Sequence, residues 1–100
     1  MAQTSEMGQT FTKTVTIKNR QGLHNRPSVL LVQLAAGYDA AIKLRKGEKE
    51  ADANSVMQVM MLAATCGTEL EVIAEGPDAE KAVREISELL ESNFEEAYKK

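Results

Sequence analysis

The chain has 100 residues, a formal net charge of −3, one histidine, one cysteine and only 4% aromatic residues. This length supports one domain with a modest core, and the scarcity of aromatic residues means that the core must be aliphatic. No apolar run approaches the roughly 20 residues of a membrane span, and a negative total charge without a basic, aromatic-rich stripe argues against nucleic-acid binding.

The N-terminal residues 1–10 are polar and lack the charged and apolar regions of a signal peptide. We therefore expect a flexible extension at 1–10 and a single domain at 11–100. Cys66 has no second cysteine with which to form an internal disulfide. We interpret it as a small apolar residue in a protein of the reducing cytoplasm, and a reactive thiol is the alternative.

The first half of the domain predicts three strands and a helix. Residues 11–18 alternate between apolar and polar side chains, as in a half-buried strand. An apolar stripe with helical spacing then predicts a helix over 26–36, with Gly37 as its left-handed end. Two further strands are predicted at 40–45 and 49–53, joined by a tight turn at Lys46 and Gly47. The second of these is short of apolar residues and charged, which is typical of a sheet edge.

The next predicted element is a short helix over 56–64, capped by Asn54 or Ser55 and ended by Gly67. Nearly every residue in it is apolar, and a small two-layer domain cannot bury all sides of such a helix. We expect Met57 and Met60 to be exposed, and the alternative is that all the methionines belong to the core.

The last part of the chain predicts a strand and a helix. Residues 69–75 alternate, which indicates a fourth strand, and Asp78 is placed to cap an amphipathic helix over 79–92. Phe94 and Ala97 would be positioned to prolong that helix. The element order is therefore β-α-β-β-α-β-α, an α+β arrangement in which the helices pack on one face of a sheet and leave the other face polar.

The segment from Gly22 to Pro27 contains the single histidine, His24, at the junction between a strand and a helix. Proline is tolerated in a first helical turn, although it biases Arg26 away from helical geometry. We therefore expect either an irregular Arg26 or a helix that begins slightly late. The positive end of the helix faces the imidazole and suits an anion. Lys18, Arg20 and Arg26 add positive charge nearby, which favours a phosphate group or an acidic partner.

Imidazole is nucleophilic and titrates near neutral pH, so His24 is suited to accept and release a phosphoryl group. The alternative is that His24 is a helix cap or an ordinary surface residue. The residues themselves leave these two interpretations open.

The run Gly22-Leu23-His24-Asn25-Arg26-Pro27 resembles the active-site segment of HPr, the histidine phosphocarrier of the phosphoenolpyruvate-dependent phosphotransferase system. The family pattern is Gly-Leu-His-x-Arg-Pro, and Asn25 occupies its variable place, where a smaller residue is more usual. A second resemblance lies at Ala53–Met57, where Ser55 opens a short helix. The likeness spans residues 11–91, and the runs 52–56 and 75–77 are most similar to the nitrogen-related branch, NPr.

The resemblance implies an open-faced β-sandwich with a four-stranded antiparallel sheet in the order 1-4-2-3 and three helices on one face. It implies a carrier rather than an enzyme, a monomer that needs no cofactor or metal. His24 would accept a phosphoryl group on Nδ1 from phosphorylated enzyme I and pass it to an enzyme IIA-type protein. Arg26 would stabilise the phosphate within a cradle formed by Asn25, Arg26, Pro27 and Ser28.

The resemblance also implies a docking surface for these partners, to which we assign Met57, Met60 and Arg20. Ser55 has two interpretations, a helix cap or a regulatory site modified by a serine kinase, as in some HPr relatives. The alternative function is a regulatory docking module whose partner binding is switched by phosphorylation of His24 or Ser55.

Overall fold

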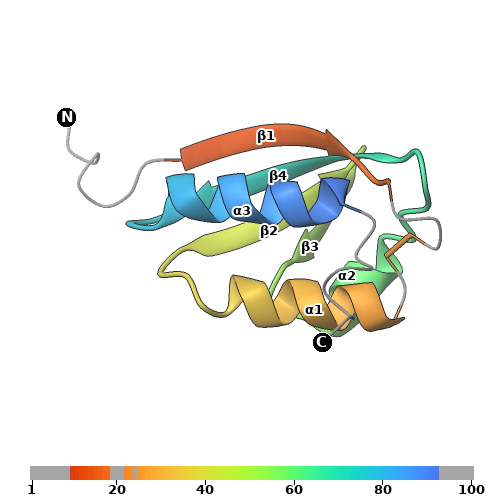
Figure 1. The fold of residues 1–100 in the computed structure, drawn as a ribbon, viewed down its shortest axis with the longest axis horizontal. Coiled ribbons are helices and arrows are strands. Elements are labelled where there is room, and N and C mark those ends of the chain that lie inside the picture. Colours follow the sequence, from red (N-terminus) through yellow and green to blue (C-terminus); the bar gives the residue numbers. More distant parts are fainter. Residues whose placement is uncertain (1–9, 19–21, 24, 93–100) are drawn as a thin grey trace.

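The computed structural model describes residues 10–18, 22–23 and 25–92. Its four strands form one antiparallel sheet in the order β1-β4-β2-β3, as the family resemblance implies (Figure 1). The strands are β1 (Thr10–Thr16), β2 (Ala41–Lys46), β3 (Lys49–Asp52) and β4 (Glu69–Glu75). The short, charged β3 lies at an edge, as the sequence predicted.

Three helices cover one face of this sheet, which confirms the predicted α+β sandwich. They are α1 (Asn25–Ala35), α2 (Val56–Met61) and α3 (Ala79–Glu91). The inward side chains of the strands are buried against the apolar stripes of the helices, and this layer forms the core. Its largest fully buried members are Val15, Ile17, Leu31, Ile42, Leu44, Val59, Leu62, Leu70, Val72, Ile86 and Leu90.

The opposite face of the sheet is polar, as predicted, because the outward positions carry threonines and charged residues. Arg45 Nε lies 3.4 Å from Glu71 Oε1 and 3.7 Å from Glu50 Oε2. These ion pairs are partly exposed at the surface and contribute little to stability. Among the described residues, no helix has both the length and the apolar character needed to cross a membrane.

The boundaries of α1 differ from the sequence prediction in two ways. The helix begins at Asn25 rather than after Arg26, so the bias that Pro27 places on Arg26 is overcome by the packing of Pro27 and Leu31 into the interior. Gly37 does not adopt a positive φ. The chain leaves α1 through a tight turn instead, in which Gly37 N–H donates to the carbonyl of Leu34 at 3.0 Å.

Helix α2 ends at Met61, earlier than predicted, and Gly67 does not terminate it. The break comes at Ala63, which adopts the left-handed region with φ of 54° although it is not glycine. Lys46 Nζ donates to the carbonyls of Leu62 and Ala63 at 2.8 and 3.3 Å, so these groups turn toward β2 instead of continuing the helix. Gly67, with φ of 93°, shapes the turn before β4.

Asp78 occupies the N-cap position of α3, but the prediction that its side chain caps the helix is wrong. Its carboxylate accepts a hydrogen bond from the backbone N–H of Asp39 at 2.7 Å. Asp78 N–H in turn donates to the carbonyl of Asp39 at 3.0 Å, so the residue joins the start of α3 to the turn before β2. Phe94 and Ala97 lie outside the described residues.

Candidate functional site

His24 and Arg20 lie outside the described residues, so the site is defined by the segments that flank His24. Leu23 precedes it and α1 begins immediately after it, at Asn25. Both flanks belong to the end of the molecule where β1 leaves the sheet and α1 begins (Figure 1).

Leu23 is held through its side chain and through both of its backbone polar groups. Its side chain is buried, its N–H donates to the carbonyl of Ala64 at 2.8 Å, and its carbonyl accepts from Ser28 Oγ at 3.2 Å. Each neutral hydrogen bond contributes on the order of 1 kcal/mol. The residue before His24 therefore has a fixed place against the domain.

Gly22 packs against the same segment that holds Leu23. It adopts φ of +72°, and a Cβ atom built on it would lie 2.5 Å from the Ala64 carbonyl oxygen and 2.9 Å from Thr65 Cα. Glycine is therefore required here both by the backbone conformation and by the close approach of another backbone. Nothing in the local sequence could identify Ala64 as the neighbour of Gly22.

The segments 17–18 and 22–23 lie beside the loop 62–68. Ile17 N–H donates to the carbonyl of Thr68 at 2.9 Å, and Gly67 N–H donates to the carbonyl of Ile17 at 2.8 Å. Cys66 Sγ lies 3.9 Å from the carbonyl oxygen of Lys18. Cys66 is a free cysteine and is exposed in this loop.

The first turn of α1 provides the positive end of a helix beside His24. It contains no acidic residue, and the Arg26 side chain is exposed. The first-turn amides of a helix point toward its N-terminal end, and here these are the amides of Asn25 and Arg26, since Pro27 has no N–H. Pro27 and Ser28 are buried. Ser28 thus supports the loop through Leu23, and the phosphate cradle over residues 25–28 stays a prediction.

The surface of α2 is apolar and exposed. The relative accessibility of Met57, Met60 and Met61 is 70%, 39% and 70%, whereas Val59 and Leu62 are buried. The predicted exposure of Met57 and Met60 is confirmed, and the alternative that all the methionines are core is wrong. The sequence analysis missed Met61, although its spacing from Met57 places both on the same side of the helix.

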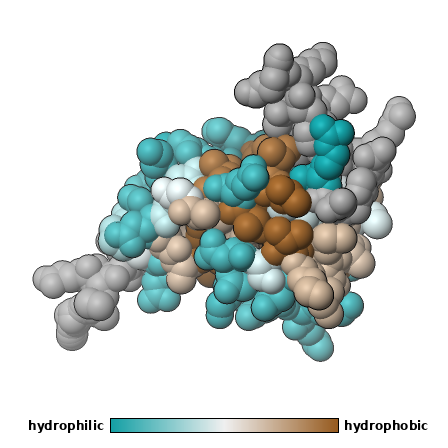
Figure 2. All heavy atoms as spheres, turned by 90° about the horizontal axis from the view of Figure 1, so that it is seen from below, coloured by the Kyte–Doolittle hydropathy of each residue, from teal (hydrophilic) through white to brown (hydrophobic). Residues whose placement is uncertain are grey.

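This surface continues across α1. Figure 2 views the molecule from the side of α1 and α2, where apolar side chains gather in the middle and hydrophilic ones surround them. The partly buried members on α1 include Leu30, Val32 and Leu34. Apolar patches bordered by polar residues are typical of protein-interaction surfaces.

Ser55 is the N-cap of α2, and its Oγ accepts a hydrogen bond from Gln58 N–H at 3.2 Å. This confirms the helix-cap interpretation, while modification of Ser55 stays a prediction. Gln58 also ties α2 to the sheet, because its Oε1 accepts from Asp52 N–H at 2.9 Å.

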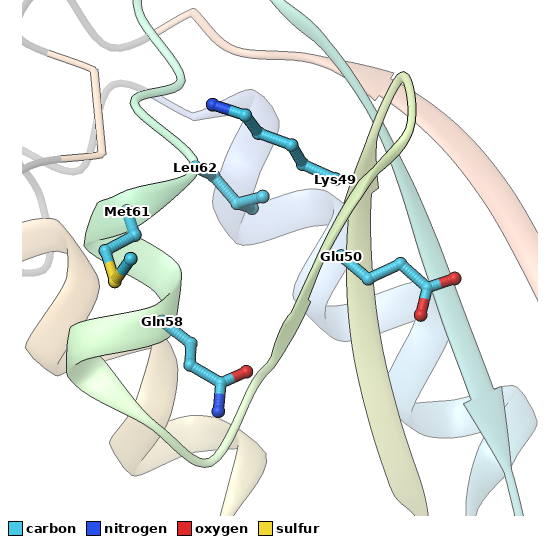
Figure 3. A pocket seen from close by; sticks show the side chains of 5 residues that line it. All are labelled: Lys49, Glu50, Gln58, Met61 and Leu62. Atoms are coloured by element: carbon cyan, nitrogen blue, oxygen red, sulfur yellow. The ribbon is translucent and has the colours of Figure 1, made fainter.

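A hollow of about 380 Å³ lies between β3 and α2 (Figure 3). It is lined by Lys49, Glu50, Gln58, Met61 and Leu62, none of which the sequence analysis assigned to the site. Figure 3 shows Gln58 directed toward β3 and Lys49 reaching across the hollow, while Glu50 points away from it. Within the described part of the chain, no three His, Cys, Asp or Glu side chains group so that they could hold a metal ion.

Comparison with known proteins identifies the family. The family model described as "PTS HPr component phosphorylation site" matches residues 11–92, which is most of the chain. The chain belongs to the HPr family. This confirms the resemblance that the segment around His24 and the run after Ala53 indicated.

For several relatives in the HPr family, the match covers nearly the whole length of the relative. The phosphocarrier protein HPr of Treponema pallidum is 45% identical over 84% of this chain and 96% of its own. The phosphocarrier protein NPr of Escherichia coli K12 is 42% identical over 87% of this chain and 98% of its own. The crystal structure of HPr from Bacillus anthracis superimposes with a TM-score of 0.80 at 33% identity, covering 82% and 98% of the two chains.

The match with one relative covers only part of that protein. The phosphoryl donor subunit DhaM of a PEP-dependent dihydroxyacetone kinase from Providencia stuartii is 38% identical over 86% of this chain, but the match spans only 18% of DhaM. The HPr-type domain therefore also occurs within a larger phosphoryl donor protein. HPr and NPr relatives match at comparable identity, 45% and 42%.

Proposed function

We propose that the chain is a phosphocarrier in which His24 accepts a phosphoryl group from phosphorylated enzyme I and passes it to a histidine of an enzyme IIA-type protein. The observation that carries this proposal is the double anchoring of Leu23, by the Ala64 carbonyl and by Ser28 Oγ, directly beside the start of α1. An acceptor that must present one ring nitrogen to a large partner benefits from a fixed attachment.

In the proposed transfer, the lone pair of His24 Nδ1 attacks the phosphorus of the donor phosphohistidine. A new P–N bond forms, the donor P–N bond breaks, and its electron pair returns to the donor imidazole. The first-turn amides of α1 and the guanidinium of the exposed Arg26 would attract the negative charge of the transferring group. Their attraction has to be strongest for the transferring group, because a relay must release what it accepts.

The direct test is to incubate the protein with enzyme I, Mg²⁺ and phosphoenolpyruvate. An acid-labile, alkali-stable phosphate should appear on the wild-type chain and be absent from His24→Ala. Asn25→Ala is the matched control, because it changes the adjacent residue without removing the acceptor, and it should keep the transfer rate within about tenfold, or about 1.4 kcal/mol of barrier. Labelling that survives in His24→Ala would overturn the proposal.

The downstream step is tested with the phosphorylated carrier alone. Mixed with an enzyme IIA of the nitrogen-related type or of a sugar-transporting type, it should lose its label to the true acceptor. A clear rate preference for the nitrogen-related protein would place the chain in the NPr-like branch. We propose that the carrier acts in the cytoplasm. Retention of the label with every enzyme IIA would refute the proposed relay while leaving phosphorylation of His24 intact.

The exposed methionines of α2 favour a second candidate, a regulatory docking module switched by phosphorylation. Met57 and Met61 are each 70% exposed, and such flexible apolar side chains suit surfaces that meet several partners. Met57→Glu separates the two candidates, with Met57→Leu as the apolar control. If docking serves only transfer, Met57→Glu and His24→Ala give the same cellular phenotype, whereas different phenotypes indicate a separate regulatory output.

The proposed modification of Ser55 would place a dianion at the start of α2 and beside its exposed methionines. The charge would suit the helix start but oppose apolar docking. Mass spectrometry after exposure to the serine kinases of the host tests this directly. Phosphate on Ser55 supports regulation, and its absence leaves Ser55 with the helix-cap role alone.

A further inference from the structure

Lys46 stands at the end of β2, on the side of the sheet that carries the helices, and it is only partly exposed. Its ammonium group donates to the carbonyl oxygens of Leu62 at 2.8 Å and Ala63 at 3.3 Å, just beyond α2. The last turn of α2 contains no basic residue of its own. Lys46 therefore supplies, from a neighbouring strand, the cation that the C-terminal end of a helix attracts.

The two carbonyls that Lys46 binds directly precede, along the chain, the carbonyl that accepts the hydrogen bond from Leu23. The next carbonyl along the chain, that of Ala64, accepts the Leu23 N–H at 2.8 Å. Ala63, between Leu62 and Ala64, adopts a left-handed conformation. This conformation costs a residue with a Cβ atom about 1–2 kcal/mol. The lysine contacts favour this conformation, because Lys46 binds both carbonyls on the side of β2.

We propose that Lys46 is a positioning residue for phosphoryl transfer, acting through Ala63 and Ala64 on the backbone that presents His24. It touches neither the acceptor nor the phosphate in this scheme. The inference rests on the proposed function and deepens it, because it assigns to Lys46 on β2 a part in holding the backbone next to His24. Nothing in the local sequence around His24 identifies this lysine.

The test compares Lys46→Met with Lys43→Met. Both remove one positive charge from β2 and keep an unbranched side chain, but Lys43 points to the opposite face and lies 3.8 Å from Glu50 in an exposed ion pair. At a temperature where both variants are folded, Lys46→Met should slow phosphoryl transfer from enzyme I by about fivefold, or about 1 kcal/mol of barrier. Lys43→Met should stay within twofold of wild type, and Lys46→Arg should recover most of the lost rate.

Two further readouts separate positioning from general stability. His24 is the single histidine, so its imidazole gives one set of NMR signals, and their titration midpoint should move in Lys46→Met but not in Lys43→Met. Amide hydrogen exchange at Leu23 should be faster in Lys46→Met, because the Ala64 carbonyl that protects it is less well held.

The outcomes distinguish this inference from the proposed function. If the wild-type chain accepts no phosphoryl group, the proposed function fails, and Leu23 exchange still decides whether Lys46 orders the loop. If transfer occurs but the two methionine variants match in rate, histidine titration and Leu23 exchange, the positioning role of Lys46 is refuted. A slower rate in Lys46→Met with unchanged Leu23 exchange also refutes it, because the effect then does not pass through Ala64.

Discussion

Replacement of Gly22 by alanine tests the close approach of Gly22 to the loop 62–68. At φ of +72° a Cβ atom carries a conformational penalty of about 1–2 kcal/mol, partly offset by the reduced freedom of the unfolded chain. The new atom would also lie 2.5 Å from the Ala64 carbonyl oxygen, so one backbone must move. Displacing it sacrifices the Leu23–Ala64 hydrogen bond, about 1 kcal/mol, and disturbs the packing around it.

We therefore expect Gly22→Ala to lower the free energy of unfolding by about 3 kcal/mol and Tm by roughly 15 °C. Gly47→Ala is the matched control, since Gly47 also has a positive φ, +61°, but nothing lies within 4 Å of the position that its Cβ atom would take. Gly47→Ala should lower the free energy of unfolding by about 1 kcal/mol, which is the conformational penalty alone. Thermal and urea denaturation followed by circular dichroism measures both, and equal destabilisation of the two variants would refute the close approach.

Three other changes probe features outside this contact. Ser55→Ala removes the cap on Gln58 N–H and should lower stability by about 1 kcal/mol, measured by urea denaturation. Ala63→Gly relieves the left-handed strain and should raise Tm by a few degrees, since the relief exceeds the roughly 0.5–1 kcal/mol entropic cost of glycine. Burial and a hydrogen bond to the Glu85 carboxylate raise the pKa of Tyr38, so the folded state holds this proton more tightly than the unfolded state. Stability should therefore fall as pH rises above about 10, and Tyr38→Phe should flatten that fall in denaturation curves recorded between about pH 9 and 11.

The strands and helices were predictable because their hydrophobic periodicity matches the faces that become buried. Leu70 and Val72 alternate with glutamates along β4, and the apolar residues of α3 repeat at helical spacing. The sequence pattern of each element therefore indicates which of its faces is buried. The order of strands in the sheet does not follow from such local signals, and here it came from the family resemblance.

The errors fall where a distant group decides a local conformation. Asp78 has the sequence position of a helix cap, but its carboxylate accepts a hydrogen bond from the backbone N–H of Asp39 instead. Gly67 is the natural residue to end α2, but the chain turns at Ala63 instead, where Lys46 from β2 binds the carbonyls of Leu62 and Ala63. Within the site, the motif identified the residues around His24, while the role of Ser28 in holding Leu23 depended on burial that the motif does not encode.

The pairing of Ile17 and Leu23 with the loop 62–68 also bears on when the segment before His24 reaches its folded position during biosynthesis. The partners are distant in sequence, and the hydrogen bonds of Ile17 with Gly67 and Thr68 continue the β1–β4 ladder, in which Thr16 pairs with Glu69. Contacts between distant segments form late, after the entropy of closing the intervening chain has been overcome. A nascent chain thus carries Leu23 long before the Ala64 carbonyl emerges to anchor it, and only molecules that have brought their first and last strands together hold the residue before His24 in its folded place.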